Sequence, residues 1–99
     1  MAELIKNLID GKWEEASTGE TFDSINPANT TEVIGTVVRS GEADIDRAVK
    51  AAQEAYGKWR LVPPPRRAEI LFRAGEILIK RKQELGGLMT REMGKVLSE

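Results

Sequence analysis

Side chains that could act as nucleophiles or general bases are few in this sequence. The 99 residues include no cysteine and no histidine, which excludes a cysteine nucleophile, a thiolate or imidazole metal site and a disulfide. Serines occur at positions 17, 24, 40 and 98, but no imidazole is present to activate any of them. The sequence therefore offers no means of nucleophilic catalysis of the usual kinds.

Gly94-Lys95 has the dipeptide of a phosphate-binding loop without the rest of the motif. That motif requires a glycine where this chain has Met89 and a serine or threonine where it has Val96. Gly94 is better interpreted as the residue that ends a helix. We likewise interpret Glu14 and Glu15 as solvated residues of a hairpin rather than as an acid/base pair.

The charge balance gives the chain no general attraction for polyanions. Fifteen basic and sixteen acidic residues leave a formal net charge of −1 at pH 7. A small phosphate or nucleic-acid binder that uses Arg66, Arg67 and Lys80 to Lys82 stays open as an alternative, and it predicts salt-sensitive binding. With no bilayer-spanning apolar run and no signal peptide pattern, we expect a soluble, cytoplasmic protein without membrane or nucleic-acid partners.

The first forty residues carry the signals of short strands. Asp10-Gly11 lies between apolar segments, the strongest local signal for a tight hairpin turn. Residues 21–25 predict a strand that ends at Asn26-Pro27, because proline fixes φ and cannot donate to a ladder. Residues 32–38 are β-branched and apolar at successive positions, which predicts a strand covered on both faces.

From Gly41 the hydrophobic period becomes helical. Apolar residues from Ile45 to Tyr56 follow helical spacing after an acidic first turn, and Gly57 is a plausible stop. The three prolines at 63–65 predict the start of a second helix over about 66–81, apolar on more than one face. A third helix is expected to end at Gly94 and to begin late or kink at Gly86-Gly87. We therefore predict an α/β class protein, α+β within this chain, with hairpin strands over about 4–38 and helices over about 42–94.

These elements contain more apolar surface than they can bury against one another. An isolated hairpin is marginally stable in water, and a helix that is apolar on two faces must bury both. We expect the face of Ile70, Ala74 and Ile77 to be exposed and to promote association if the chain stands alone. The pattern indicates part of a larger fold.

Five segments, taken in order, carry a family resemblance. They are "LIDGKW", "ETFDSINPANTTEVIGTVV", "DIDRAVKAAQEAYGKWR", "RRAEILFRAGEILIKRKQEL" and "MTREMGKVLSE", and together they cover essentially the whole chain. Their order and spacing resemble the N-terminal region of the NAD(P)-dependent aldehyde dehydrogenase superfamily. The resemblance implies that this chain contains an N-terminal hairpin region and the first helices of a cofactor-binding domain. That domain would belong to a much longer polypeptide, of which residues 1–99 would be a partial N-terminal portion.

The resemblance also implies a chemistry. Members of the family oxidise an aldehyde to a carboxylic acid with NAD or NADP, using a cysteine thiolate, a glutamate and an oxyanion-binding asparagine. All of these lie downstream of the matching region, as do the nucleotide contacts, so no catalytic or cofactor-binding residue is assigned here. The chain alone is expected to be inactive, and its parent enzyme to be a homodimer or homotetramer.

One auxiliary site of the family does reach this region. Some members hold a monovalent cation with a main-chain carbonyl just before the Asn-Pro and with an acidic residue two before the Gly-Lys. These positions correspond to Ile25 and Glu92. Oxygen ligands suit Na⁺ or K⁺. The alternative is that Ile25 is an ordinary strand residue and Glu92 a solvated carboxylate at a helix end.

Three functional hypotheses follow from the sequence. The first is the N-terminal part of an NAD(P)-dependent aldehyde dehydrogenase. The second is a complete, non-catalytic interaction domain that uses the same pattern as a scaffold. The third is the small phosphate or nucleic-acid binder described above. The sequence does not distinguish among aldehydes or between NAD and NADP.

Overall fold

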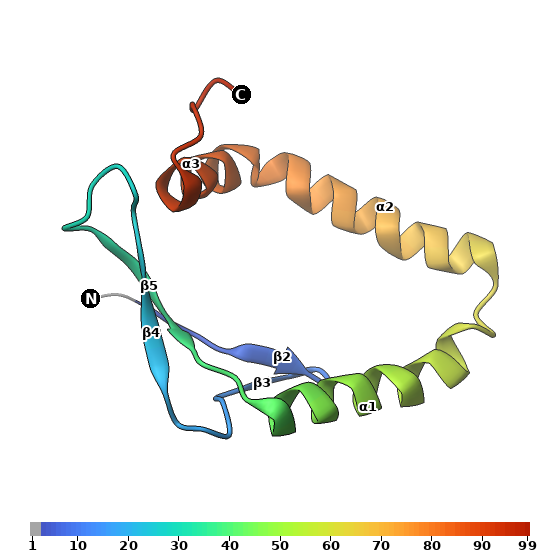
Figure 1. The fold of residues 1–99 in the computed structure, drawn as a ribbon. Coiled ribbons are helices and arrows are strands. Elements are labelled where there is room, and N and C mark those ends of the chain that lie inside the picture. Colours follow the sequence, from blue (N-terminus) through green and yellow to red (C-terminus); the bar gives the residue numbers. More distant parts are fainter. Residues whose placement is uncertain (1–2) are drawn as a thin grey trace.

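The computed structural model describes residues 3–99 as five strands followed by three helices. The strands are β1 (Leu4–Ile5), β2 (Asn7–Ile9), β3 (Lys12–Glu14), β4 (Thr21–Ile25) and β5 (Val33–Val38). The helices are α1 (Glu42–Trp59), α2 (Pro64–Lys80) and α3 (Lys82–Met93). This succession of strands and then helices confirms the predicted fold class (Figure 1).

The β2–β3 hairpin turns at Asp10-Gly11, as predicted. Both residues have positive φ, 52° and 74°, which is the conformation that a two-residue turn of this kind requires. The register then pairs Leu8 with Trp13 across the antiparallel ladder. Both side chains are exposed in this structure, at 58% and 68%.

A second sheet has the strand order β1-β5-β4. β4 runs antiparallel to β5, whereas β1 pairs with β5 in parallel. The register shifts between Ser24, which pairs with Gly35, and Ile25, which pairs with Val33. This irregularity bends the end of β4 where the chain leaves the sheet towards Asn26-Pro27.

The expectation that β5 is covered on both faces is met only in part. Gly35 and Val38 are buried, but Val33 is 39% exposed. The helices project away from the sheet instead of lying across it, so the described residues supply no second layer (Figure 1).

Two predicted helix boundaries were wrong, and both errors concern glycine. α1 continues through Gly57 to Trp59, because one glycine costs a helix interior only about 1 kcal/mol. α3 begins at Lys82 and includes both Gly86 and Gly87 without a late start. Gly94 does end α3 as predicted, with φ at 75° and its N–H donated to the carbonyl of Thr90 at 2.9 Å.

The junction between β5 and α1 is built around Asp44, the one fully buried side chain among residues 3–99, at 2% exposure. Its carboxylate accepts the N–H of Gly41 at 2.9 Å, so it caps the helix that contains it. The N–H and hydroxyl of Ser17 also donate to it, at 3.0 to 3.1 Å. Arg47 donates at 2.8 Å and pairs as well with Glu14 at the end of β3.

These donors determine the ionisation of Asp44. The Gly41 N–H contributes most, and the Arg47 guanidinium and the Ser17 donors add to it, so the pKa of Asp44 is held well below its ordinary value. The Asp44 carboxylate thereby holds the loop after β3 against the start of α1. Arg47, which binds both Asp44 and Glu14, connects the end of β3 to the same place.

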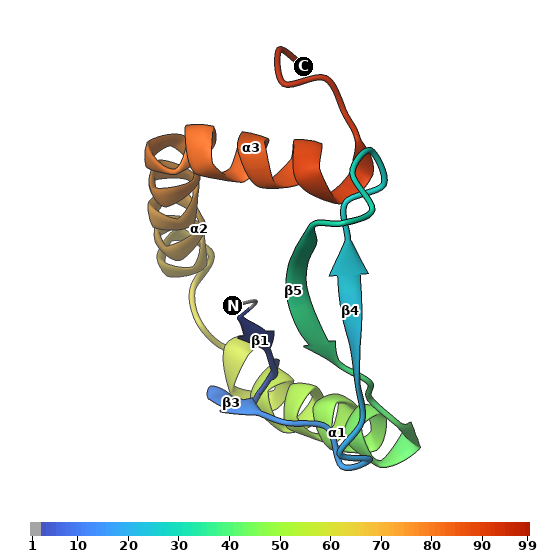
Figure 2. The ribbon, with the colours of Figure 1, turned by 90° about the vertical axis from the view of Figure 1, so that its left-hand side faces the viewer.

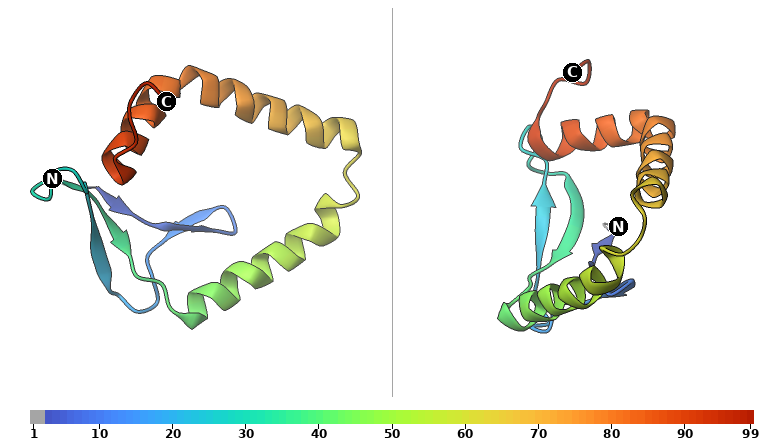
Figure 3. Two further views of the ribbon diagram at one scale, coloured as in Figure 1. Left: turned by 45° about the horizontal axis from the view of Figure 1, so that its top comes forward. Right: turned by 90° about the vertical axis from the view of Figure 1, so that its right-hand side faces the viewer.

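The chain as a whole is open. Its radius of gyration is 17.1 Å, whereas a compact domain of this length has about 13 Å. α1 and α2 diverge as two arms joined by residues 60–63, and α3 returns towards the β4–β5 turn (Figures 2 and 3). Among residues 3–99, only Ile9, Ala16 and Val38 are buried apolar residues.

The apolar faces of the helices are therefore exposed. Ile45 and Val49 on α1 are 60% and 51% exposed, and Ile70 and Ile77 on α2 are 47% and 53% exposed. The predicted exposure of the face of Ile70, Ala74 and Ile77 is confirmed.

Replacement of Asp44 tests the junction. In the complete gene product, Asp44→Asn should lower the melting temperature by more than about 5 °C, because the amide keeps the shape but loses the charge that binds Gly41, Ser17 and Arg47. Asp46→Asn, on the exposed side of the same helix, is the control and should change it by less than about 1 °C.

The same variant tests the pH dependence. A carboxyl whose folded pKa is depressed contributes stability above its unfolded pKa of about 3.9 and loses it as the pH falls towards the folded pKa. The difference in melting temperature between wild type and Asp44→Asn should therefore shrink below about pH 4. Parallel curves from neutral pH to pH 3 would contradict the role given to the Asp44 charge.

Exposure of the α2 face predicts association of the isolated 99-residue chain. Light scattering should detect species larger than a monomer, and Ile70→Lys with Ile77→Lys should reduce them, because charge interrupts the apolar face. Lys80→Gln, at the end of the same helix, should leave association unchanged. A monodisperse monomer that unfolds cooperatively would show that the exposed face needs no partner.

Candidate functional site

The C-terminal end of α3 is attached to the β4–β5 hairpin by two polar contacts between distant segments. The hydroxyl of Ser24 donates to both oxygens of Glu92, each at 3.0 Å. Arg91 donates from Nε to Glu32 at 2.6 Å. The last turn of α3 lies beside the turn between β4 and β5 (Figure 2).

Local sequence explains why these groups meet. Gly94 ends α3 in a left-handed conformation, which leaves Arg91 and Glu92 in its last turn. The register shift after Ser24 lies at the matching end of β4, where the ladder is disrupted and the strand bends. The two segments are thereby brought together although 68 residues separate Ser24 from Glu92.

The C-terminal end of α3 has a negative electrostatic potential. The last carbonyl groups of an α-helix carry a partial negative charge, which favours Arg91 there and disfavours Glu92. Glu92 therefore gains from a donor such as Ser24, and a cation placed near it would gain from both the carboxylate and the helix end.

The neighbouring ion pair leaves one net negative charge. The hydrogen bond from Arg91 holds the pKa of Glu32 below its ordinary value, so that Glu32 is ionised and balances Arg91. Glu92 is then the unbalanced charge among these three residues. One monovalent cation would neutralise it, whereas a divalent cation would exceed it.

The two residues of the predicted cation site lie on the two segments that this contact joins, Ile25 at the end of β4 and Glu92 at the end of α3. Glu92 is bound to the hydroxyl of Ser24, and Ile25 follows Ser24 in β4. Ile25 is 47% exposed and Glu92 is exposed, so neither is sealed in a protein interior. A backbone carbonyl, a carboxylate and a hydroxyl are all hard oxygen donors, and they fit Na⁺ or K⁺ better than a soft metal.

Other kinds of site find little support in the described residues. Among residues 3–99, no group of three or more His, Cys, Asp or Glu side chains could hold a metal ion. The basic residues nearest to each other at the two ends of α2, Arg67 and Lys80, are separated along the helix by about 20 Å at 1.5 Å per residue, and the two groups do not form one patch. Within the described range, no helix has the length and apolarity to cross a bilayer.

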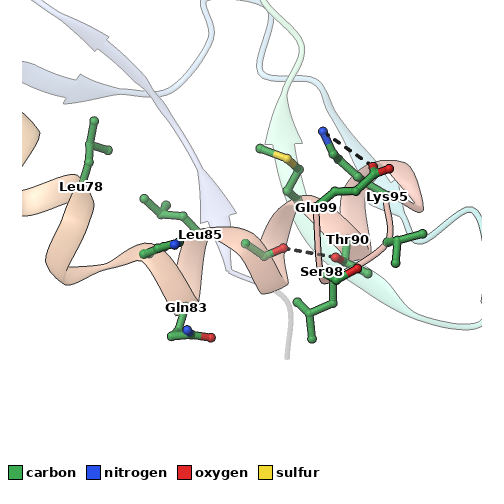
Figure 4. A pocket seen from close by; sticks show the side chains of 12 residues that line it. Leu78, Gln83, Leu85, Thr90, Lys95, Ser98 and Glu99 are labelled. Carbon is green, nitrogen blue, oxygen red and sulfur yellow. Dashed lines mark hydrogen bonds and ion pairs between the residues drawn. The ribbon is translucent and has the colours of Figure 1, made fainter.

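A pocket of about 370 Å³ lies between α3 and residues 95–99 (Figure 4). Two of its polar side chains have partners: Lys95 lies 3.9 Å from Glu99, and Thr90 donates its hydroxyl to the carbonyl of Gly86 at 3.2 Å. The pocket contains neither Ile25 nor Glu92, the two residues of the predicted cation site.

Sequence reasoning missed three residues of the candidate site. Ser24 was considered only as a nucleophile, and Glu32 and Arg91 were not considered as a pair. The available signal was weak: a serine directly before the predicted carbonyl ligand, and a basic residue directly before the predicted acidic one. Neither indicates a contact until the fold is known.

The chain belongs to the aldehyde dehydrogenase family, whose model matches residues 13–99. The chain is 50% identical over 95 residues to malonate-semialdehyde dehydrogenase 1 of Shouchella clausii, which covers 96% of this chain and 19% of that protein. It is 42% identical over 99 residues to alpha-ketoglutarate semialdehyde dehydrogenase of Haloferax volcanii, which covers 100% of this chain and 20% of that protein. The chain therefore spans about one fifth of the length of these relatives.

Solved structures agree with this assignment. A betaine aldehyde dehydrogenase from Staphylococcus aureus in complex with NAD⁺ superposes with a TM-score of 0.90 at 32% identity, over 95% of this chain and 19% of that one. An NADP dependent enzyme from E. coli superposes with a TM-score of 0.91 at 34% identity, over 97% of this chain and 20% of that one.

The Arg91–Glu32 pair gives a testable coupling. In the complete gene product, Arg91→Gln and Glu32→Gln should destabilise less in combination than the sum of the two single changes, because each removes the same contact. Arg73→Gln and Glu69→Gln, a pair within α2, should show a smaller coupling, since that pair is exposed and local. Thermal unfolding of wild type, the two single variants and the double variant measures the coupling free energy of each pair. Strictly additive destabilisation by Arg91→Gln and Glu32→Gln would contradict the contact.

Proposed function

We propose that this chain is the N-terminal portion of the cofactor-binding domain of an enzyme that oxidises an aldehyde to a carboxylic acid with NAD or NADP. The observation that carries the proposal is agreement with the aldehyde dehydrogenase family in both sequence and fold over nearly the whole chain. The exposed apolar faces of α1 and α2 support it, because they require a larger protein to cover them.

For the substrate we propose a short semialdehyde. This rests on the relatives, which are named for malonate semialdehyde and alpha-ketoglutarate semialdehyde. The residues that contact the aldehyde lie outside this chain in the proposal.

The chemistry is divided between this chain and the remainder of the enzyme. NAD or NADP, when bound, supplies the hydride acceptor. The nucleophilic cysteine must come from another part of the polypeptide, because this chain contains no cysteine. What this chain contributes is structural: a sheet and two helical arms joined at Asp44, on which the cofactor-binding domain is completed.

The chain also contributes a cation site in this proposal. The main-chain carbonyl of Ile25 and the carboxylate of Glu92 would hold Na⁺ or K⁺ at the junction of β4 and α3. The oxygen donors and the single unbalanced charge support a monovalent ion. The ion would stabilise the junction and would take no part in the reaction.

We propose further that the parent enzyme is cytoplasmic and forms a homodimer or homotetramer. A stand-alone interaction domain is the second candidate, in which a separate partner protein would cover the exposed apolar faces of α1 and α2. The family match over residues 13–99 makes the enzyme the better proposal.

Activity measurements separate the two candidates. The complete gene product, given NAD⁺ or NADP⁺ and malonate semialdehyde, should produce NADH or NADPH, followed by absorbance. The isolated 99-residue chain, assayed identically, should produce none because it has no cysteine. Aldehyde-dependent reduction of the nucleotide by the isolated chain would contradict the assignment of the chemistry to residues outside this chain. A complete gene product that is inactive with a panel of short semialdehydes would favour the interaction domain.

A further inference from the structure

Arg67 differs from the other charged residues of α2. Those residues are all exposed and line one side of the helix at spacings of three and four: Arg66, Glu69, Arg73, Glu76 and Lys80. Arg67 lies outside this stripe and is only partly exposed. Ile70, Ala74 and Ile77 follow it three, seven and ten residues later, so Arg67 extends the apolar face that these three residues form.

The Nε of Arg67 is buried without a hydrogen-bond partner. Among residues 3–99 it is the one buried side-chain nitrogen or oxygen that has none. A buried donor without an acceptor costs free energy, and nearly all such groups in folded proteins have a partner. We therefore expect the acceptor for this N–H to come from outside the described residues.

The acidic residues of the same helix are not placed to supply the acceptor. Glu69 lies about 200° around α2 from Arg67, and it pairs with Arg73 at 2.7 Å. Glu76 lies about 180° around the helix. None of the ion pairs among residues 3–99 includes Arg67. The first turn of α2 contains no acidic residue either, although the helix dipole favours one there.

Covering the apolar face would bury the rest of the guanidinium as well. In the proposed enzyme other polypeptide covers Ile70, Ala74 and Ile77, and the relatives are about five times as long as this chain, so that polypeptide is available. Arginine keeps its charge in proteins, and a buried charge without an opposite charge is strongly destabilising. A backbone carbonyl can accept the N–H but does not neutralise the charge, whereas a carboxylate does both.

We propose that the segment that covers this face of α2 carries an Asp or Glu whose carboxylate pairs with Arg67. The inference rests on the proposed function, in which this chain is part of a longer enzyme, and it adds the chemistry of the partner segment. An apolar surface can slide along Ile70 and Ile77, but a carboxylate that meets the planar guanidinium does so in one geometry. The pair thus determines the position of the covering segment on α2.

Stability measurements on the complete gene product distinguish a carboxylate from a purely apolar cover. Arg67→Met keeps much of the side-chain length and removes the charge. If a carboxylate faces Arg67, the change leaves that carboxylate buried and unpaired, and the melting temperature should fall by more than about 5 °C. If no acid is present, the change removes an uncompensated charge and the melting temperature should rise. Arg66→Met, at the exposed neighbouring position, is the control and should change it by less than about 1 °C.

Cross-linking identifies the partner. Arg67→Lys keeps a positive charge, and a water-soluble carbodiimide couples the new amine to a carboxylate in contact with it, forming an amide with loss of water. Mass spectrometry of the digested complete gene product should find position 67 joined to an Asp or Glu outside residues 1–99. Arg73→Lys should couple to Glu69 as the positive control, and Arg66→Lys should not couple to the partner of position 67.

The outcomes separate this inference from the proposed function. An unchanged or raised melting temperature for Arg67→Met would overturn the inference. So would a cross-link from position 67 to an acidic residue within this chain, or no cross-link from it while Arg73→Lys couples to Glu69. These results do not depend on turnover, so an active dehydrogenase without the cross-link refutes the pair alone. A complete gene product that forms the cross-link but oxidises no semialdehyde supports the pair and contradicts the proposed function.

Discussion

The buried carboxylate of Asp44 is the interaction on which the arrangement of this chain depends. It accepts hydrogen bonds from Gly41, Ser17 and Arg47, and these come from the start of α1, from the loop after β3 and from α1 itself. An apolar core of three residues could not fix these segments. Burial of a carboxylate costs free energy unless hydrogen-bond donors surround it. The donors that lower the pKa of Asp44 must therefore keep their positions, and this requirement specifies the geometry of the junction.

The arrangement of the three helices follows from that junction and from the small apolar core. α1 leaves the sheet at Asp44, α2 returns from the proline turn, and α3 reaches back to β4 through Ser24 and Glu92. The result is an open frame closed by polar contacts at two points (Figure 1). Its apolar side chains face outward, which is the condition expected of one part of a larger aldehyde dehydrogenase domain.

Features determined by neighbouring residues were the ones predictable from sequence. The Asp10-Gly11 turn, the bounds of β4 and the end of α3 at Gly94 depend on φ preferences of single residues, and all three were predicted correctly. The stop at Gly57 was wrong because a single glycine only weakens a helix, and α1 continues to Trp59.

Contacts between distant segments could not be predicted in this way. The sequence predicted an acidic first turn for α1, but the hydrogen bonds between Asp44 in that turn and Ser17 cross 27 positions. The pairing of Ser24 with Glu92 crosses 68. No local sequence pattern predicts such contacts. The cation site was predicted only from the family resemblance. The order of five segments likewise identified the family before any geometry was known.

The central claim is that the apolar faces of α1 and α2 are completed by other parts of a longer enzyme. Hydrogen exchange of the backbone amides of α2, compared between the complete gene product and the isolated 99-residue chain, tests it most directly. We predict exchange slower by at least about a hundredfold in the complete product, because burial suppresses the local opening that exchange requires. Equal exchange rates in the two proteins would contradict the claim.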